Sequence, residues 1–332
     1  MMSVSSRSTL RRRTLAAAAA TAVLALTLAA CGSSASSTHS DAHSSGNSSM
    51  SSATNSATSS ATNSAVPGMP GTPGMSGMPG MGTGTPMAMA AGNGLAAEQD
   101  GYRLDAPSAT LAAGQPVQYR FSITGPDGKP VTDFAVEQTE QLHFYAIRSD
   151  LTGYQHVHPV LAADGGWTAD LAPLRPGSWR LYASFTPNSG SGKGTDFVLS
   201  RTVTVPGPAA DAAADTPLPP AASSTTVDGY TATVQGELMA GMAHPLTITI
   251  SKDGQPVTDL QPYLDSYAHL SAFHAGDQAF AHLHPESTVN GDHGGPSLAF
   301  HAEPATAGDW RLFLQFRTAG QLHTAALTLH VD

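Results

Sequence analysis

Two stretches of the chain, HFYAIRSDLTGYQHVHP at residues 143–159 and HLSAFHAGDQAFAHLHP at residues 269–285, share one pattern of histidines. Each stretch contains a histidine, twelve other residues, a second histidine, one residue, and a third histidine followed by proline. The histidines are His143, His156, His158, His269, His282 and His284. A repeat at identical spacing indicates that the two stretches are copies of one structural unit.

Each stretch has the composition of a β-hairpin. In the first copy, alternating aromatic and β-branched residues flank a turn near Asp150. With that turn, Phe144 faces Val157 on the apolar side of the hairpin, and all three histidines fall on the opposite side. The second copy pairs Leu270 with Leu283 in the same register. We expect these four apolar side chains to point into the cores of two domains.

Three imidazoles on one face of a hairpin can share a metal ion, because opposed residues lie roughly 5 Å apart at Cβ. Neutral imidazole suits copper, zinc and nickel. We therefore predict two metal sites, with copper as the expected ion and zinc as the other candidate. The predicted ligands are His143, His156 and His158 in the first site and His269, His282 and His284 in the second.

A site with three protein ligands leaves one position for water or a fourth ligand. The candidates for that fourth ligand are Tyr145 and Asp150 in the first site and His274, Glu286, His301 and His323 in the second. The competing interpretation is that the histidines lie on the surface without binding metal, and that each His-Pro pair only ends a strand. Under that interpretation the histidines are incidental to function.

Short strands separated by turn residues run through two regions of similar length. The motif Gly-x-Pro-Val-Thr-Asp at 128–133 returns at 254–259, and Gly-x-Trp-Arg at 177–180 returns at 308–311. This pattern predicts an all-β protein with two tandem immunoglobulin-like antiparallel β-sandwich domains. Trp179 and Trp310 are expected in their cores. The predicted boundaries are 1–30 for a signal peptide, 31–100 for a tether, 101–205 for the first domain, 206–228 for a Pro/Ala linker and 229–332 for the second domain.

The N-terminus has the pattern of an export signal. Basic residues precede a short apolar run, and Leu-Ala-Ala-Cys ends at Cys31, the single cysteine of the chain. This ending resembles a bacterial lipobox, which implies that Cys31 becomes lipidated and anchors the protein to the outer face of the cell membrane. A plain secretory signal is the alternative.

The predicted tether is rich in Ser, Thr and Ala, and then in Met, Gly and Pro, so it is expected to be disordered. The methionine thioethers of this segment suit Cu(I). The alternative is that the methionines have accumulated by chance in a low-complexity linker.

The charge balance excludes some partners. The formal net charge is −10, and cleavage before Cys31 would remove four arginines, so the exported chain is more acidic still. Such a chain is not expected to bind nucleic acid or anionic headgroups. The sequence contains no Gly-x-Ser-x-Gly motif, and its one cysteine is the lipidation candidate, so we do not expect an enzyme.

The repeated Gly-x-Pro-Val-Thr-Asp motif, the triad ending in His-x-His-Pro, and Gly-x-Trp-Arg together resemble small immunoglobulin-type domains of the CopC- and YtkA-like kind. The signal and tether resemble those of an actinobacterial secreted lipoprotein. These resemblances imply a copper association and a copper-handling partner protein. The expected function is copper buffering, sensing or delivery by a lipid-anchored extracytoplasmic protein. The alternative is a non-catalytic cell-surface interaction module.

Overall fold

The computed structural model describes residues 92–208, 211, 215–286 and 288–332. These residues belong to one compact unit, Gly77–Asp332. The regular elements in the described ranges are all strands, which form two successive antiparallel domains and confirm the predicted fold class. The predicted signal peptide, Cys31 and nearly all of the predicted tether lie outside these ranges. Within them, no helix has the length and apolar character needed to cross a membrane.

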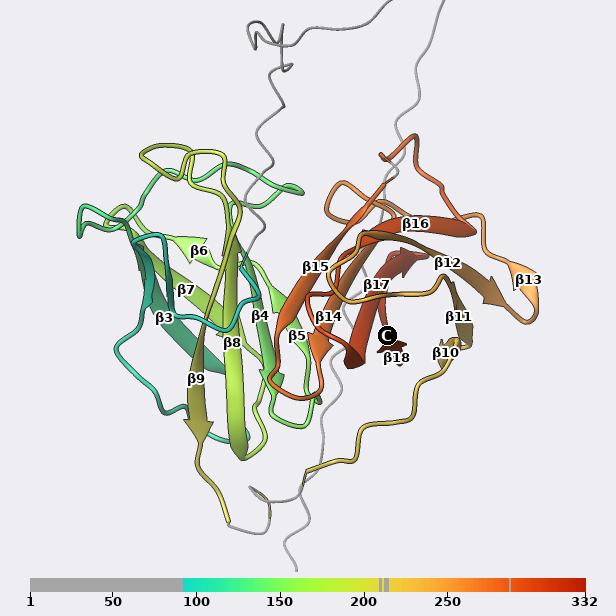
Figure 1. Ribbon diagram of the computed structural model, residues 1–332, viewed down its shortest axis with the longest axis horizontal. Helices are drawn as coiled ribbons and strands as arrows, with labels where there is room; N and C mark the ends of the chain where they lie inside the picture. Colours follow the sequence, from blue (N-terminus) through green and yellow to red (C-terminus); the bar gives the residue numbers. More distant parts are fainter. Residues whose placement is uncertain (1–91, 209–210, 212–214, 287) are drawn as a thin grey trace, which may run out of the picture. The chain divides into compact units, whose positions relative to one another are not determined.

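The first domain is a sandwich of a five-stranded and a four-stranded sheet, coloured from cyan to yellow-green in Figure 1. The five-stranded sheet has the order β1-β2-β3-β7-β6, and the four-stranded sheet has the order β5-β4-β8-β9. The strands are β1 (Glu98–Gln99), β2 (Tyr102–Asp105), β3 (Val117–Thr124), β4 (His143–Arg148), β5 (Gln155–Val157), β6 (Val160–Leu161), β7 (Gly166–Leu171), β8 (Gly177–Phe185) and β9 (Phe197–Val205).

The second domain repeats this arrangement, coloured from gold to red in Figure 1. Its strands follow one hydrogen-bonded path, β10-β11-β12-β16-β15-β14-β17-β18, with β13 paired to β12. The strands are β10 (Ser224–Val227), β11 (Tyr230–Gln235), β12 (His244–Lys252), β13 (Gln255–Pro256), β14 (Ala268–His274), β15 (Phe280–Pro285), β16 (Ser297–Ala302), β17 (Gly308–Thr318) and β18 (Gln321–Val331).

The histidine hairpins lie where the chain passes from one sheet to the other. In the second domain β15 pairs with β14 through Leu283 and then with β16 from His284 onward. In the first domain the equivalent stretch is interrupted at Pro159, with β5 in one sheet and β6 in the other. His158 therefore lies at a corner of the sandwich.

Each domain has its own apolar core. Phe144 and Val157 pack in the first core, where the Phe144 ring stacks on Phe121 with centroids 4.9 Å apart. Leu270 and Leu283 are buried in the second core. All four predicted inward residues are therefore confirmed, because alternation along a strand puts neighbouring side chains on opposite faces.

The Gly-x-Trp-Arg motif anchors the same strand in both domains. Trp179 and Trp310 are buried, as predicted, and each indole N–H donates to the backbone carbonyl four residues before it. The glycine is needed because φ is +133° at Gly177 and +123° at Gly308. A Cβ there would lie 2.6 Å from Arg148 Nε in the first domain.

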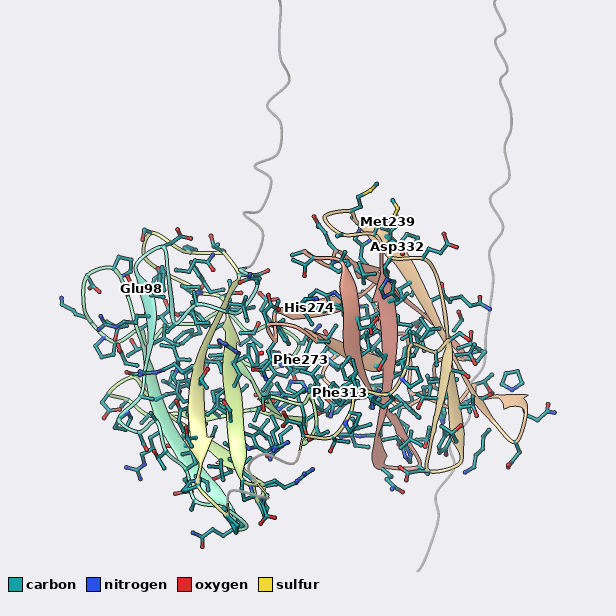
Figure 2. The ribbon with its side chains drawn as sticks, turned by 60° about the horizontal axis from the view of Figure 1, so that its bottom comes forward. Glu98, Met239, Phe273, His274, Phe313 and Asp332 are labelled. Atoms are coloured by element: carbon teal, nitrogen blue, oxygen red, sulfur yellow. The ribbon has the colours of Figure 1, made fainter. Side chains whose placement is uncertain are left out.

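A third apolar cluster joins the two domains, and we call it the joint. It contains Tyr145, Ile147, Leu151, Tyr182 and Val198 from the first domain and Phe273, Phe280 and Phe313 from the second, with Tyr154 packed against it. In the second domain the joint draws on β14, β15 and β17, and Phe273 and Phe313 meet edge to face with centroids 5.9 Å apart. Figure 2 labels both of these phenylalanines.

The joint uses equivalent positions of the two repeats. Tyr154 and Phe280 are 126 positions apart, which is the offset of the histidine pattern, and Tyr182 and Phe313 are 131 apart, which is the offset of the Gly-x-Trp-Arg motif. Tyr154 contacts Phe313, and Phe280 contacts Tyr182, with centroid distances of 4.2 and 5.4 Å. The same pair of positions therefore meets twice, with the domains exchanged, which is the pattern of an isologous interface.

Candidate metal centre

The β4–β5 hairpin has the predicted register. Phe144 pairs with Val157, and Tyr145 pairs with His156. This register brings His143, His156 and His158 together on the side away from the core, and one ligand nitrogen of each lies within 4.8 Å of the others. We call these three residues the histidine group. Their ring centroids are 4.8 to 5.3 Å apart.

Hydrogen bonds fix the proton positions on two of these rings. His143 Nε2 lies 3.0 Å from the carbonyl oxygen of Glu137, and His156 Nδ1 lies 2.8 Å from the side-chain oxygen of Gln315. Both oxygens can only accept, so these two nitrogens carry the protons of the neutral rings. The remaining nitrogens, His143 Nδ1 and His156 Nε2, then face one another at 3.0 Å with their lone pairs. A cation held between them removes the repulsion.

Gln315 belongs to β17 of the second domain and is itself held in orientation. Its amide nitrogen donates to Thr324 Oγ1, and its oxygen also accepts from the hydroxyl of Tyr154. The carbonyl end of the amide is thereby turned to His156. Histidine ligands of metals generally donate their second N–H to such an acceptor, which fixes the tautomer and the direction of the ring.

His158 completes the histidine group. Its Nδ1 lies 3.9 Å from the carboxylate of Glu140, and its Nε2 is buried without a hydrogen-bond partner among the described residues. A buried imidazole nitrogen without a partner is costly for a folded protein. A bound metal ion would give this nitrogen a partner.

A fourth histidine from the other domain lies beside this group. His269 on β14 is 2% exposed, and its ring centroid is 6.3 Å from that of His143 and 6.0 Å from that of His156. Its Nε2 is 3.2 Å from the carbonyl of Tyr263 and 3.3 Å from that of Leu264. Its Nδ1 is buried with no hydrogen-bond partner in the described ranges.

The environment keeps these rings neutral. Burial, reinforced by the neighbouring imidazoles, holds the pKa of His156 well below its ordinary value. Burial also lowers the pKa of His158, and it lowers that of His269 to about 4. Desolvation disfavours the charged ring, and nearby imidazoles add repulsion once one is charged. The neutral ring is the form that binds metal.

The second predicted site can be followed only in part. The β14–β15 register pairs Ser271 with His282, as predicted, and β15 continues to pair His284 with His301. The side chains of His282 and His284 lie outside the described part of the structure. Their role as ligands stays a prediction, whereas the third predicted member, His269, lies beside the first site.

The candidates for a fourth ligand have other contacts in the described structure. Asp150 pairs with Arg148, and His323 with Asp228. His274 lies 2.8 Å from Asp277, and His301 lies 3.3 Å from Glu286. Tyr145 stacks on His156 with ring centroids 4.5 Å apart.

The prediction missed His269 as a neighbour of the first site and missed Gln315 altogether. One signal was present in the sequence, because Tyr145 and Ile147 make the histidine face of β4 apolar as well. A strand that is apolar on both faces is buried on both faces. Every residue of β4 is indeed buried, so something had to cover the face that bears the histidines.

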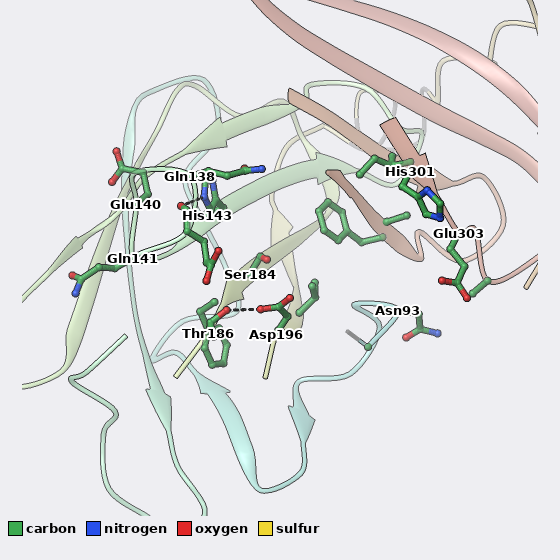
Figure 3. Close-up of a pocket in the computed structure, with 18 of the residues that line it drawn as sticks. Asn93, Gln138, Glu140, Gln141, His143, Ser184, Thr186, Asp196, His301 and Glu303 are labelled. Carbon is green, nitrogen blue, oxygen red and sulfur yellow. Dashed lines mark hydrogen bonds between the residues drawn. The ribbon is translucent and has the colours of Figure 1, made fainter. Parts of the chain in front are cut away.

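A cleft of about 540 Å³ lies beside one member of the histidine group. His143 lines it, and Glu140 and Glu303 are among the acidic residues around it (Figure 3). Asp196 also lines the cleft and accepts a hydrogen bond from Thr186. The carboxylates around this cleft attract cations to the side of the histidine group on which His143 lies.

The fold and this site define the class of protein. The chain is an all-β protein of two tandem immunoglobulin-like domains with a buried histidine cluster between them. Residues 97–204 and 225–332 each match the family described as "Domain of unknown function (DUF8832)", and together they make up more than half of the chain. The protein belongs to this family, with two copies of its domain. The likeness to CopC- and YtkA-like domains stays a prediction.

No curated protein matches the chain. Among solved structures, the chain is similar to FdeC, an Escherichia coli adhesin, with 16% identity, 71% of this chain and 65% of that chain covered, and a TM-score of 0.23. InvD of Yersinia pseudotuberculosis matches with 14% identity, 70% and 57% covered, and a TM-score of 0.21. The D0-D1 domain of intimin matches with 11% identity, 69% and 97% covered, and a TM-score of 0.18. The chain spans less than two thirds of the FdeC and InvD chains, and TM-scores this low carry no argument about function.

Proposed function

We propose that this protein binds a metal ion through His143, His156 and His158 and acts as a non-catalytic metal carrier or buffer. The observation that carries the proposal is the pair of nitrogens, His143 Nδ1 and His156 Nε2, that face one another at 3.0 Å while their other nitrogens are occupied by carbonyl acceptors. His158 Nε2, which has no hydrogen-bond partner in the part of the chain that the structure describes, supports the same position for an ion.

The donor set favours copper, with zinc as the other ion it accepts. Several neutral imidazoles suit both metals, and among divalent first-row ions Cu²⁺ binds most tightly to a given nitrogen site. The low pKa of His156 and His158 supports binding in mildly acidic surroundings, because protons then compete weakly for the rings.

The proposal places the protein outside the cytoplasm. The signal pattern at 1–30 and the lipobox-like ending at Cys31 support a lipid anchor on the outer face of the cell membrane. A domain pair held there would take up or hand over copper, and a copper-handling protein is the expected partner. Nothing in this role requires a chemical reaction of the protein.

The test is a titration of the full chain with Cu(II) and with Zn(II) in the presence of a competing chelator. The variant His156→Asn/His158→Asn removes two ligand nitrogens, and the first asparagine amide can still donate to Gln315. We expect tight binding to be lost in this variant and kept in His330→Gln, whose histidine is exposed at the surface. Equal affinity in the double variant and the parent would overturn the proposal.

The second candidate function is a cell-surface interaction module without metal. Its support is limited to the large apolar side chains exposed on the described surface, which a partner could cover: Val136, Val160, Met239, Met242 and Leu322. This candidate stands if the parent protein binds neither ion above the level of a histidine-free control protein.

A further inference from the structure

We infer that the metal site is shared between the two domains, with His269 as its fourth ligand, so that a bound ion ties the domains together. This inference rests on the proposed function, because it needs an ion at the histidine group. It goes further in making the second domain part of the site and the stability of the joint dependent on the metal.

The first step is the state of His269. One nitrogen of the ring donates to the carbonyls of Tyr263 and Leu264, which fixes the proton on Nε2 and leaves a lone pair on Nδ1. Among the residues that the structure describes, that buried Nδ1 has no hydrogen-bond partner, and the ring lies next to those of His143 and His156. A buried lone pair on a ring that neighbours two ligand imidazoles has the chemistry of a further ligand.

The second step is that the same domain also orients a ligand of the first. Gln315 and His269 are paired across β17 and β14, and Gln315 accepts the hydrogen bond from His156 Nδ1. The second domain therefore contributes both a ligand and the group that sets the tautomer of another ligand. Without it, the site has three histidines and His156 lacks its acceptor.

The third step is that the domains are already in contact around the site. The Tyr154 hydroxyl donates to Ser271, and the Gln278 amide donates to the carbonyl of Arg148. These contacts and the aromatic joint hold His269 close to the histidine group before an ion arrives. Metal binding then needs only a small adjustment, since the ring centroids of His269 and His156 are 6.0 Å apart against 4.8 to 5.3 Å within the group.

The experiment compares the parent chain with His269→Gln and Gln315→Ala. Glutamine can keep the donor to the carbonyls of Tyr263 and Leu264 while removing the Nδ1 lone pair. Loss of an orienting partner of a metal ligand weakens binding by about 10–100-fold, and we expect both variants to lose Zn(II) affinity by about this factor or more. His330→Gln, at the surface, is the control and should keep the affinity of the parent.

Two further measurements separate a shared site from a site in the first domain alone. X-ray absorption of the Zn(II)-loaded protein should count four imidazoles in the parent and three in His269→Gln. In calorimetry, saturating Zn(II) should raise the unfolding temperature of the parent more than that of His269→Gln, whereas a site in the first domain alone would give equal shifts. The imidazole count in the parent tests the inference even if the variants fail to fold.

The outcomes distinguish the two proposals. If His156→Asn/His158→Asn loses the ion while His269→Gln binds as tightly as the parent and the parent shows three imidazoles, the proposed function stands and the shared site is wrong. If the parent binds no ion, both fail.

Discussion

The ring of Tyr154 in the first domain lies parallel to the ring of Phe313 in the second, with centroids 4.2 Å apart and planes inclined by 6°. Tyr154 lies two residues before His156, the second histidine of the pattern, and its hydroxyl also donates a hydrogen bond to Ser271. One residue of the contact between the domains therefore belongs to the same hairpin as the predicted metal ligands. A substitution in the joint should therefore change metal affinity, and loss of the metal should change the stability of the joint.

We first predict the effect of weakening the joint. Phe313→Ala removes a buried ring from it, and truncating a buried Phe costs about 3–5 kcal/mol. Each domain keeps its own core, so we expect calorimetry to resolve two unfolding transitions in place of one cooperative transition. Tyr154→Phe, which keeps the ring and loses only the hydroxyl, should cost about 1 kcal/mol and leave a single transition. Two transitions in the parent protein would show that the joint does not couple the domains.

We next predict the dependence of stability on pH. Because burial lowers the pKa of His156, His158 and His269, the unfolded chain takes up protons near pH 6.5 while the folded chain does not. The contribution of these rings is complete above pH 6.5 and declines as the pH falls toward about 4, the pKa of folded His269. The slope is at most about 1.4 kcal/mol per pH unit for each ring.

Urea unfolding of the metal-free protein at pH 7, 6 and 5 measures this slope. His269→Gln removes one of the three rings, so its free energy of unfolding should fall less steeply with decreasing pH than that of the parent. A slope equal to that of the parent would show that His269 is not held neutral by the fold.

The last prediction concerns the second hairpin. Because His269 lies beside the first site, His282 and His284 are the two histidines of the second pattern left for a separate ion. We expect His282→Ala/His284→Ala to keep the tightly bound ion of the main site and to lose any second, more weakly bound ion. The stoichiometry of a Zn(II) titration measures both. Loss of the tight ion would mean that these two histidines belong to the main site.

The hairpin could be predicted from the sequence because its register satisfies a local demand. Pairing Phe144 with Val157 buries two apolar side chains, and alternation then places the histidines on the other face. The position of the tryptophans followed from their repeated motif. These features depend on residues close to one another in the sequence or on a repeat, so the sequence alone is enough to predict them.

The composition of the site could not be predicted in the same way. His269 and Gln315 approach the first hairpin only because the two domains pack through their outer faces. That packing depends on the shape of the joint, which no local pattern encodes. The alternatives considered for a fourth ligand were taken from the same domain, and the neighbour that the structure provides comes from the other.

The repeated contact in the joint has a consequence for the origin of the protein. Tyr154 contacts Phe313, and the equivalent residues Phe280 and Tyr182 also contact each other. Such a surface is self-complementary, so a single domain bearing it would pair with an identical copy. Duplication and fusion of such a domain would turn that homodimer into one chain whose two halves can differ in sequence. The position equivalent to Gln315 is Ser184 in the first repeat, and that of Tyr145 is Ser271 in the second. In a fused chain these equivalent positions can differ, so Gln315 can accept a hydrogen bond from His156 while its counterpart is a serine. In a symmetric homodimer both positions would hold the same residue.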